Sequence, residues 1–346
     1  MKKLLTIVLI WVGICFQVQS QDLHYSQHVN NPLYYNPALT GFIQQKARVN
    51  LMYADRYRQA YSSGGMKTSF GSADMNFSLG GPNRRSFFGL GAYFYHHRRG
   101  LNAVVDNVAA ISTSYRLLLD EEYKHSLSLG FNVSLWNRTL NTNDLQFGSQ
   151  YNGMMYDPGQ ISVENLSFAP QNNMNAATGI VYTYDSKDVF KGYIGFSVLN
   201  LYPDPLRVDR TYLPMRYNIY SGLNFDLGKT SLSPSLMIDY QRDAMEIYSG
   251  AMVNYSVVKS KSMSIDFFAG PYLRMYKNPV GDFTFYTANL VTGIDANDWQ
   301  IMFSVDNTLG SSKSALGGFT GFELSLQYAF GQSLPKNTPI YCPTFR

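Results

Sequence analysis

The sequence is short of charge. Asp, Glu, Lys and Arg together make up 15% of its 346 residues, whereas a typical soluble domain has about 25%. The net charge is +4, and it falls to +2 without Lys2 and Lys3, which begin the chain's leader. Such a small excess indicates neither a nucleic-acid partner nor an acidic one. So few charged residues are also unusual for a protein surrounded by water.

Cysteine is almost absent, with only Cys15 and Cys342. Cys15 follows Ile14, which is too bulky for the small residue that lipid attachment needs before the cysteine. We therefore interpret Cys15 as one apolar residue of the leader. The mature chain then keeps Cys342 alone, which excludes an intramolecular disulfide. Cys342 is either an unreactive thiol in a terminal tail or a partner for another chain.

Long hydrophobic runs are also missing. The longest, residues 4–16, follows Lys2 and Lys3 and precedes Val18 and Ser20, a pattern typical of a secretory signal peptide over residues 1–20 with cleavage near Ser20/Gln21. The run is shorter than the roughly 17 to 25 residues that an uncleaved membrane anchor needs. No other stretch reaches 18 apolar residues, so the mature chain is periplasmic, extracellular or a β-barrel.

Catalytic and metal-binding motifs are lacking as well. The chain has no Gly-x-Ser-x-Gly elbow, Walker loop, His-Glu-x-x-His helix or Cys-x-x-Cys pair. His96 and His97 are adjacent, but neighbours on a strand point to opposite faces and cannot share one metal ion. We predict no enzyme, and no catalytic, cofactor or metal site. The basic run from His96 to Arg99 is either a solvated strand end or an outer rim that contacts polysaccharide or lipid phosphate.

The residues that are plentiful favour strands. Phe, Trp and Tyr make up 15% of the chain, and Gly numbers 28. In several stretches apolar and polar residues alternate, as they do on a strand with one face in lipid and the other in a lumen. The clearest stretch alternates Leu127, Leu129, Phe131, Val133 and Leu135 with Ser126, Ser128, Gly130, Asn132 and Ser134. The pattern predicts an all-β, antiparallel transmembrane barrel of the outer membrane.

We predict a single barrel over residues 46–330 with about fourteen strands. The long connections, near residues 139–173, 201–212 and 307–317, all follow odd-numbered strands, as expected if the first strand runs outward and periplasmic turns are short. A soluble β-sandwich would also alternate, but its strands are usually shorter. The predicted strands are 46–57, 65–79, 86–98, 103–119, 123–138, 174–184, 190–200, 213–227, 231–242, 244–258, 262–276, 281–295, 298–306 and 318–330.

Four charged residues fall at positions that should face the lumen: Asp239, Glu246, Asp266 and Arg274. They could form a selectivity ring along a conducting path. The other interpretation is a satisfied polar network that fills a small barrel. The sequence leaves both interpretations open.

The segments outside the barrel, residues 21–45 and 331–346, are predicted to be short and periplasmic. Pro32 and Pro37 constrain the first of them and Asn36 favours a turn, so it is not a membrane strand. Tyr34 and Tyr35 supply rigid aromatic surface between the prolines. The segment either packs under or into the barrel or binds a partner through Pro32, Tyr34, Tyr35, Asn36 and Pro37. The terminal tail has the same two interpretations.

Several blocks of sequence resemble one known family. The most specific are QDLHYSQ at residues 21–27 and NPLYYNPALTG at residues 31–41. They are followed by GFSVLNL at 195–201, LSPSLMIDY at 232–240, SVDN at 304–307, GFELSL at 321–326 and YCPTF at 341–345. Together they resemble the PorP/SprF family of type IX secretion membrane proteins over the whole mature chain. Ser304 and Val305 depart from that family's pattern, in which aromatic residues are common there.

The resemblance implies a non-enzymatic outer-membrane component of the type IX secretion and gliding machinery. It implies two kinds of protein partner: a secreted surface adhesin or its C-terminal domain, and periplasmic lipoproteins of the same system. The barrel itself would contact outer-membrane lipid, and no cofactor is expected. The alternative left open by composition is a diffusion porin or small-solute transporter of the outer membrane.

Overall fold

The fold is taken from a computed structural model of the chain. The predicted leader, its cleavage site and nearly all of the terminal tail with Cys342 lie outside the described part. The residues that the structure describes are 23–58, 65–79, 86–100, 104–122, 124–141, 147–157, 159–160, 170–186, 190–201, 213–242, 244–260, 263–277, 283–310, 313 and 318–331.

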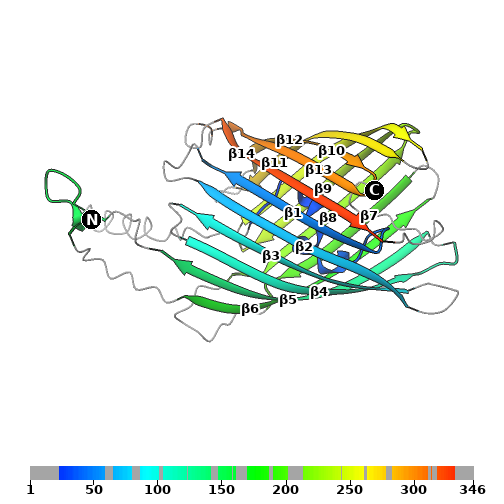
Figure 1. The fold of residues 1–346 in the computed structure, drawn as a ribbon, viewed down its shortest axis with the longest axis horizontal. Coiled ribbons are helices and arrows are strands. Elements are labelled where there is room, and N and C mark those ends of the chain that lie inside the picture. The colour runs from blue at the N-terminus through cyan, green and yellow to red at the C-terminus, as the bar shows by residue number, and fades with distance from the viewer. Residues whose placement is uncertain are drawn as a thin grey trace, which may run out of the picture.

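Fourteen antiparallel strands form a closed barrel, in which each strand pairs with its neighbours in sequence and β1 pairs with β14 (Figure 1). The prediction of an all-β barrel with about fourteen strands is confirmed. The strands are β1 (Ala47–Arg56), β2 (Met66–Leu79), β3 (Ser86–Arg99), β4 (Val104–Leu118), β5 (His125–Leu140), β6 (Gln171–Asp185), β7 (Phe190–Leu199), β8 (Arg216–Asp226), β9 (Thr230–Gln241), β10 (Ala244–Lys259), β11 (Ser264–Lys277), β12 (Phe283–Ala296), β13 (Trp299–Thr308) and β14 (Phe319–Phe330).

The strand boundaries lie close to those that alternation predicts. The largest differences are at the starts of β6 and β8, which begin at Gln171 and Arg216 rather than at 174 and 213. The barrel runs from Ala47 to Phe330, beside the expected 46–330. In the closing pair, Ala47 lies opposite Phe330 and Arg56 opposite Gly321.

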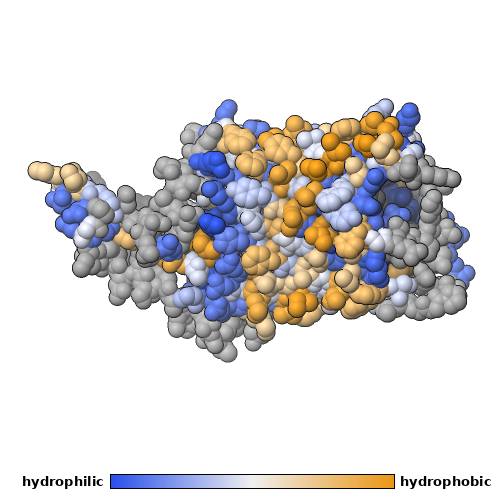
Figure 2. All heavy atoms as spheres, in the orientation of Figure 1, coloured by the Kyte–Doolittle hydropathy of each residue, from blue (hydrophilic) through white to orange (hydrophobic). Residues whose placement is uncertain are grey.

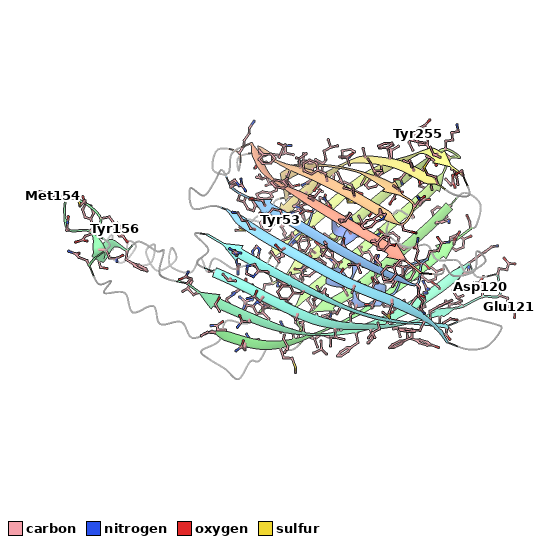
Figure 3. All side chains as sticks on the ribbon, in the orientation of Figure 1. Tyr53, Asp120, Glu121, Met154, Tyr156 and Tyr255 are labelled. Carbon is pink, nitrogen blue, oxygen red and sulfur yellow. The ribbon has the colours of Figure 1, made fainter. Side chains whose placement is uncertain are left out.

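The connections divide by length between the two ends of the barrel. The three longest, residues 141–170, 200–215 and 309–318, all follow odd-numbered strands, as the sequence predicted. We call their end the outer rim and the opposite end the periplasmic rim, because outer-membrane barrels carry their longer loops outside. Figure 3 shows the outer rim on the side of Met154 and the periplasmic rim on the side of Asp120.

The outward face is apolar, as lipid requires. On β5, the exposed side chains include Leu129, Phe131 and Leu135, while the alternating residues Ser128 and Asn132 are buried. A broad band of hydrophobic residues crosses the middle of the visible face, with hydrophilic residues on both sides of it (Figure 2). This band matches the apolar belt of a barrel that sits in a membrane.

Three short helices lie between the chain's described start and β1: η1 (His28–Asn30), α2 (Pro32–Tyr35) and η2 (Pro37–Leu39). Within the described residues, every helix is too short or too polar to be a membrane-crossing segment.

Candidate functional site

Residues 23–43, which we call the luminal plug, lie inside the barrel and not beneath it (Figure 1). The plug starts near the outer rim, where His24 lies 3.4 Å from Glu246 of β10. It ends in the periplasmic half, where Gly41 N donates to Asp74 of β2 at 2.8 Å. Gln27, Asn31, Asn36 and Ala38 have no exposed surface. A water-filled channel beside the plug would expose them, so plug and wall are packed tightly there.

The prolines explain the local shape of the plug. Pro32 stands at the start of α2 and Pro37 at the start of η2, positions where the fixed proline φ is already helical and no donor is lost. Asn36, which precedes Pro37, is extended, as a residue before proline prefers. Its side chain accepts a hydrogen bond from Ala38 N at 2.8 Å and so caps η2. The chain therefore turns twice without forming a strand.

A buried carboxylate holds the outer part of the plug. Glu323 of β14 accepts hydrogen bonds from the backbone N–H groups of Ser26 at 2.9 Å and Gln27 at 2.8 Å. Arg56 of β1 pairs with the same carboxylate, which has no exposed surface. An ion this deeply buried is stable only when its charge and its lone pairs are matched. The plug thus supplies two of the donors that the buried Glu323 side chain needs.

The middle of the plug is aromatic and lies against a second buried ion pair. Arg216 of β8 donates through Nε to Asp239 of β9 at 2.9 and 2.7 Å and through Nη1 to the Tyr34 hydroxyl at 3.0 Å. Its guanidinium lies 5.3 and 5.4 Å from the ring centres of Tyr34 and Tyr35. Tyr25 meets Tyr34 edge-on at 5.3 Å. The cluster joins Tyr25 and the helix α2 of the plug to strands β8 and β9 of the wall.

Wall hydroxyl groups satisfy backbone carbonyls in the second half of the plug. Ser197, Ser128 and Ser114 donate to the carbonyl oxygens of Tyr35, Ala38 and Thr40, at 2.6, 2.7 and 2.6 Å. Irregular backbone at membrane depth needs such partners, because an unpaired carbonyl there costs several kcal/mol. These three serines of the alternating wall pattern are thus hydrogen-bond partners of the plug.

Three wall glycines make room for this close approach. Cβ atoms at Gly89, Gly130 and Gly179 would overlap, respectively, the Thr40 carbonyl, the backbone of residues 37–38 and the Asn36 side chain. Only residues without a side chain let the plug backbone lie this close to the wall. The surface on which the plug sits is therefore shaped for it.

The five residues predicted to bind a partner all lie in the plug. Pro32, Tyr34, Tyr35, Asn36 and Pro37 are buried in the lumen. Of the two arrangements considered for the segment, packing into the barrel is the one that the structure has. Their role in partner binding stays a prediction, and in this state a partner could reach them only if the plug moved.

The charged residues predicted to face the lumen take different places. Asp239 pairs with Arg216, and Glu246 lies 3.4 Å from Arg274 Nε, all of them buried. These pairs form a polar network with the plug. Asp266 is half-buried near the start of β11 and belongs to neither pair. The sequence prediction missed Glu323, Asp306, Arg56 and Arg216, whose signal is a charged residue on a strand that alternates apolar and polar residues.

The basic run at the end of β3 splits between the faces, as alternation requires. His97 is buried and its Nδ1 lies 2.8 Å from the Thr68 hydroxyl, whereas Nδ1 of the less buried His96 lies 2.7 Å from Asn107 Oδ1. Arg99 pairs with Asp106.

Among the described residues, no group of three or more His, Cys, Asp or Glu side chains is placed to bind a metal ion.

Comparison with known proteins gives the family. A family model described as type IX secretion system membrane protein PorP/SprF matches residues 17–328. The chain belongs to the PorP/SprF family. The match covers the plug and the whole barrel except the end of β14. The plug is therefore part of what this PorP/SprF protein shares with the family model. No curated protein matches the sequence.

Solved structures similar to this PorP/SprF protein are outer-membrane barrels of low sequence identity. The CymD monoaromatic hydrocarbon channel has 12% identity and a TM-score of 0.50, over 88% of this chain and 93% of that one. A Pseudomonas aeruginosa FadL homologue has 12% identity and a TM-score of 0.46, over 85% and 93%. Identities this low show the fold alone. The family and the barrel together place the PorP/SprF protein in the outer membrane.

Proposed function

We propose that this PorP/SprF protein is a non-enzymatic component of the type IX secretion and gliding machinery that acts as a closed platform. In this proposal its outer loops hold a secreted surface adhesin, or the C-terminal domain of one, and its periplasmic rim docks lipoproteins of the same system. The observation that carries the proposal is the plug: in a secretion-family barrel, residues 23–43 occupy the lumen through which a porin would conduct.

The alternative, a diffusion porin or small-solute transporter, is less well supported by the lumen. A porin keeps a polar, water-filled path between its rims. Here the plug begins beside Glu246 near the outer rim and ends beside Asp74 in the periplasmic half. Wall hydroxyls such as that of Ser128 donate to plug carbonyls between these points. A transport function would require the plug to leave these partners.

An outer hairpin offers a surface for the secreted partner. Residues 147–157 project away from the barrel on its outer side (Figure 3). An isolated bridge pairs Tyr151 with Tyr156, and Asn152 Oδ1 accepts from Met154 N and Met155 N at 3.0 and 2.9 Å. Met154 is 90% exposed and Met155 64%. Flexible apolar side chains on an ordered turn suit a polypeptide partner.

The periplasmic rim offers a separate, acidic turn after β4. Asp120 accepts hydrogen bonds from His125 N at 2.8 Å and Lys124 N at 2.9 Å. Desolvation alone would raise the pKa of Asp120, but these hydrogen bonds outweigh it and hold the pKa below its usual value. Asp120 therefore orders the turn as a carboxylate. Glu121 lies beside it at the periplasmic rim (Figure 3), and the exposed Glu122 pairs with Lys124 at 2.5 Å.

The proposal is tested by purifying a tagged copy from outer membranes in mild detergent and identifying the proteins that accompany it by mass spectrometry. We expect an adhesin-type protein and secretion-system lipoproteins. The double variant Met154→Ser with Met155→Ser should lose most of the adhesin and keep the lipoproteins, because it removes only the apolar tip of the hairpin. Met263→Ser, an exposed methionine at the periplasmic rim, is the matched control and should keep the adhesin.

Two results would count against the proposal. If the folded barrel is recovered alone and deletion of its gene leaves secretion intact, the porin alternative is favoured. If the hairpin variant and the control lose the adhesin equally, the hairpin is not the contact surface.

A further inference from the structure

A cavity of about 440 Å³ lies above the plug at the outer rim. Its walls come from strand ends on that side: Arg56 ends β1, Met66 begins β2 and Arg99 ends β3. Its floor is made by the first described residues of the plug, Leu23 to Tyr25. The volume falls within the range of about 300–1,000 Å³ that small-ligand pockets have.

The cavity presents donors and acceptors that the described residues leave without hydrogen-bond partners. Arg274 Nη2 and the Tyr25 hydroxyl are buried and make no hydrogen bond within the described part of the chain. Arg274 Nε and Glu246 Oε1 lie 3.4 Å apart as an ion pair, and neither makes a hydrogen bond there. Arg274 and Glu246 are each more than nine-tenths buried. Buried polar groups are normally satisfied, so these atoms indicate a missing partner that both donates and accepts.

Charge limits what that partner can be. Arg56 already lies within ion-pair distance of Glu323 and of Asp306, and Arg274 lies 3.4 Å from Glu246. The third arginine of the lining, Arg99, pairs with Asp106. These three guanidinium groups thus already face four carboxylates. A further anion would meet carboxylates that already match the positive charge, and a cation would meet three arginines. A neutral ligand avoids both penalties.

Aromatic rings complete the lining. Tyr57, Tyr276 and Tyr286 are half-buried around the cavity, and the Tyr286 hydroxyl donates to that of Tyr57 at 3.1 Å. Aromatic faces pack against the C–H faces of a sugar ring, and sugar hydroxyls both donate and accept hydrogen bonds. A hydroxyl group can therefore accept from Arg274 and donate to Glu246 at once, which a carboxylate cannot do.

We propose that this cavity is a binding site for a neutral saccharide that enters from the outer side. The inference does not depend on the proposed secretion role. It assigns Arg274 and Glu246 to the ligand hydroxyls and Tyr286 to the ring face. The plug forms the floor of the site, so ligand binding there would also stabilise the plug in the lumen.

The test is calorimetric titration of the full mature protein in a polyoxyethylene detergent, which has no sugar headgroup to compete. The probes are cellobiose, maltose and lactose, with galactose and galacturonic acid as a neutral and acidic pair, and a neutral tetrapeptide of Gly and Ser. We expect at least one neutral saccharide to bind. Tyr286→Leu should weaken it by about tenfold or more, the effect of losing one good ring contact. Glu246→Gln should weaken it as well.

The matched control is Tyr255→Leu, because Tyr255 is an exposed tyrosine of β10 outside the cavity (Figure 3). It should bind like the wild type. Tyr286→Leu keeps the test valid if Glu246→Gln does not fold. Tighter binding of galacturonic acid than of galactose, binding of the tetrapeptide alone, equal weakening by the control, or no binding of any saccharide would each overturn the proposal.

Discussion

Deleting residues 23–41 is expected to turn a barrel that does not conduct into one with stable open steps in planar bilayers. The deletion removes the helices η1, α2 and η2 and bares the wall that they cover. That wall carries Ser112, Ser114, Ser128 and Asn218, all buried against the plug or its neighbours. Such a polar surface fills with water once it is free, as in the lumen of a porin. The wild type should show no resolved conductance steps, and the deletion variant should show persistent ones.

The matched control is deletion of the outer hairpin, residues 147–157, which leaves the lumen untouched and should stay closed. Both variants must first show heat-modifiable migration, so that only folded barrels are compared. Open conductance steps in the wild type, equal to those of the plug deletion, would contradict a closed lumen. A folded plug deletion that stays silent would show that something other than the plug closes the barrel.

Removing the carboxylate of Asp239 is expected to be among the most destabilising single changes in the wall. Arg216 has no exposed surface, and its Nε atom donates to both carboxylate oxygens of Asp239. Asp239→Ala leaves the guanidinium buried among neutral groups such as the Tyr34 hydroxyl and the Leu23 carbonyl, at a cost of about 3–5 kcal/mol. The measurement is the urea midpoint for loss of heat-modifiable migration, compared with wild type.

A double variant separates the charge effect from packing. Arg216→Met with Asp239→Leu removes both charges and keeps apolar volume, so it should recover much of the stability that Asp239→Ala loses. A double variant as unstable as the single one would mean that packing, and not the unpaired charge, dominates. A single variant as stable as wild type would contradict the buried ion pair.

The wall of the barrel was predictable because lipid imposes a period of two on each strand. Along β5, residues such as Leu129 and Phe131 had to face outward once Ser128 and Gly130 faced inward, and the strand's place followed without knowledge of its neighbours. The same alternation put Asp239 and Glu246 in the lumen. It also fixed which connections lie together, since an antiparallel barrel returns to the same rim after every second strand.

What lies within the lumen was not predictable in the same way. A serine that faces water and a serine that bonds a plug carbonyl look alike in sequence, so Ser128 could not be told apart from a pore-lining residue. The partners are also distant: Glu323 binds Ser26, which is 297 residues earlier in the chain. The prolines at 32 and 37 showed that the segment is not a strand, but whether it lay under, inside or outside the barrel depended on the wall glycines opposite it.

The most direct test of the seated plug is a disulfide between Thr40→Cys and Ser112→Cys, in a Cys342→Ser background, formed in intact outer membranes. The two hydroxyl oxygens are 2.6 Å apart, so the substituted thiols should oxidise readily. A protease site placed in the connection 80–85 would then give two fragments that stay joined without reductant. Thr40→Cys paired with Ser304→Cys, which lies beside Gln27 near the outer part of the plug, should stay unlinked. Efficient linkage of the first pair alone is the predicted result; equal linkage of both pairs, or of neither, would contradict a plug seated in the lumen.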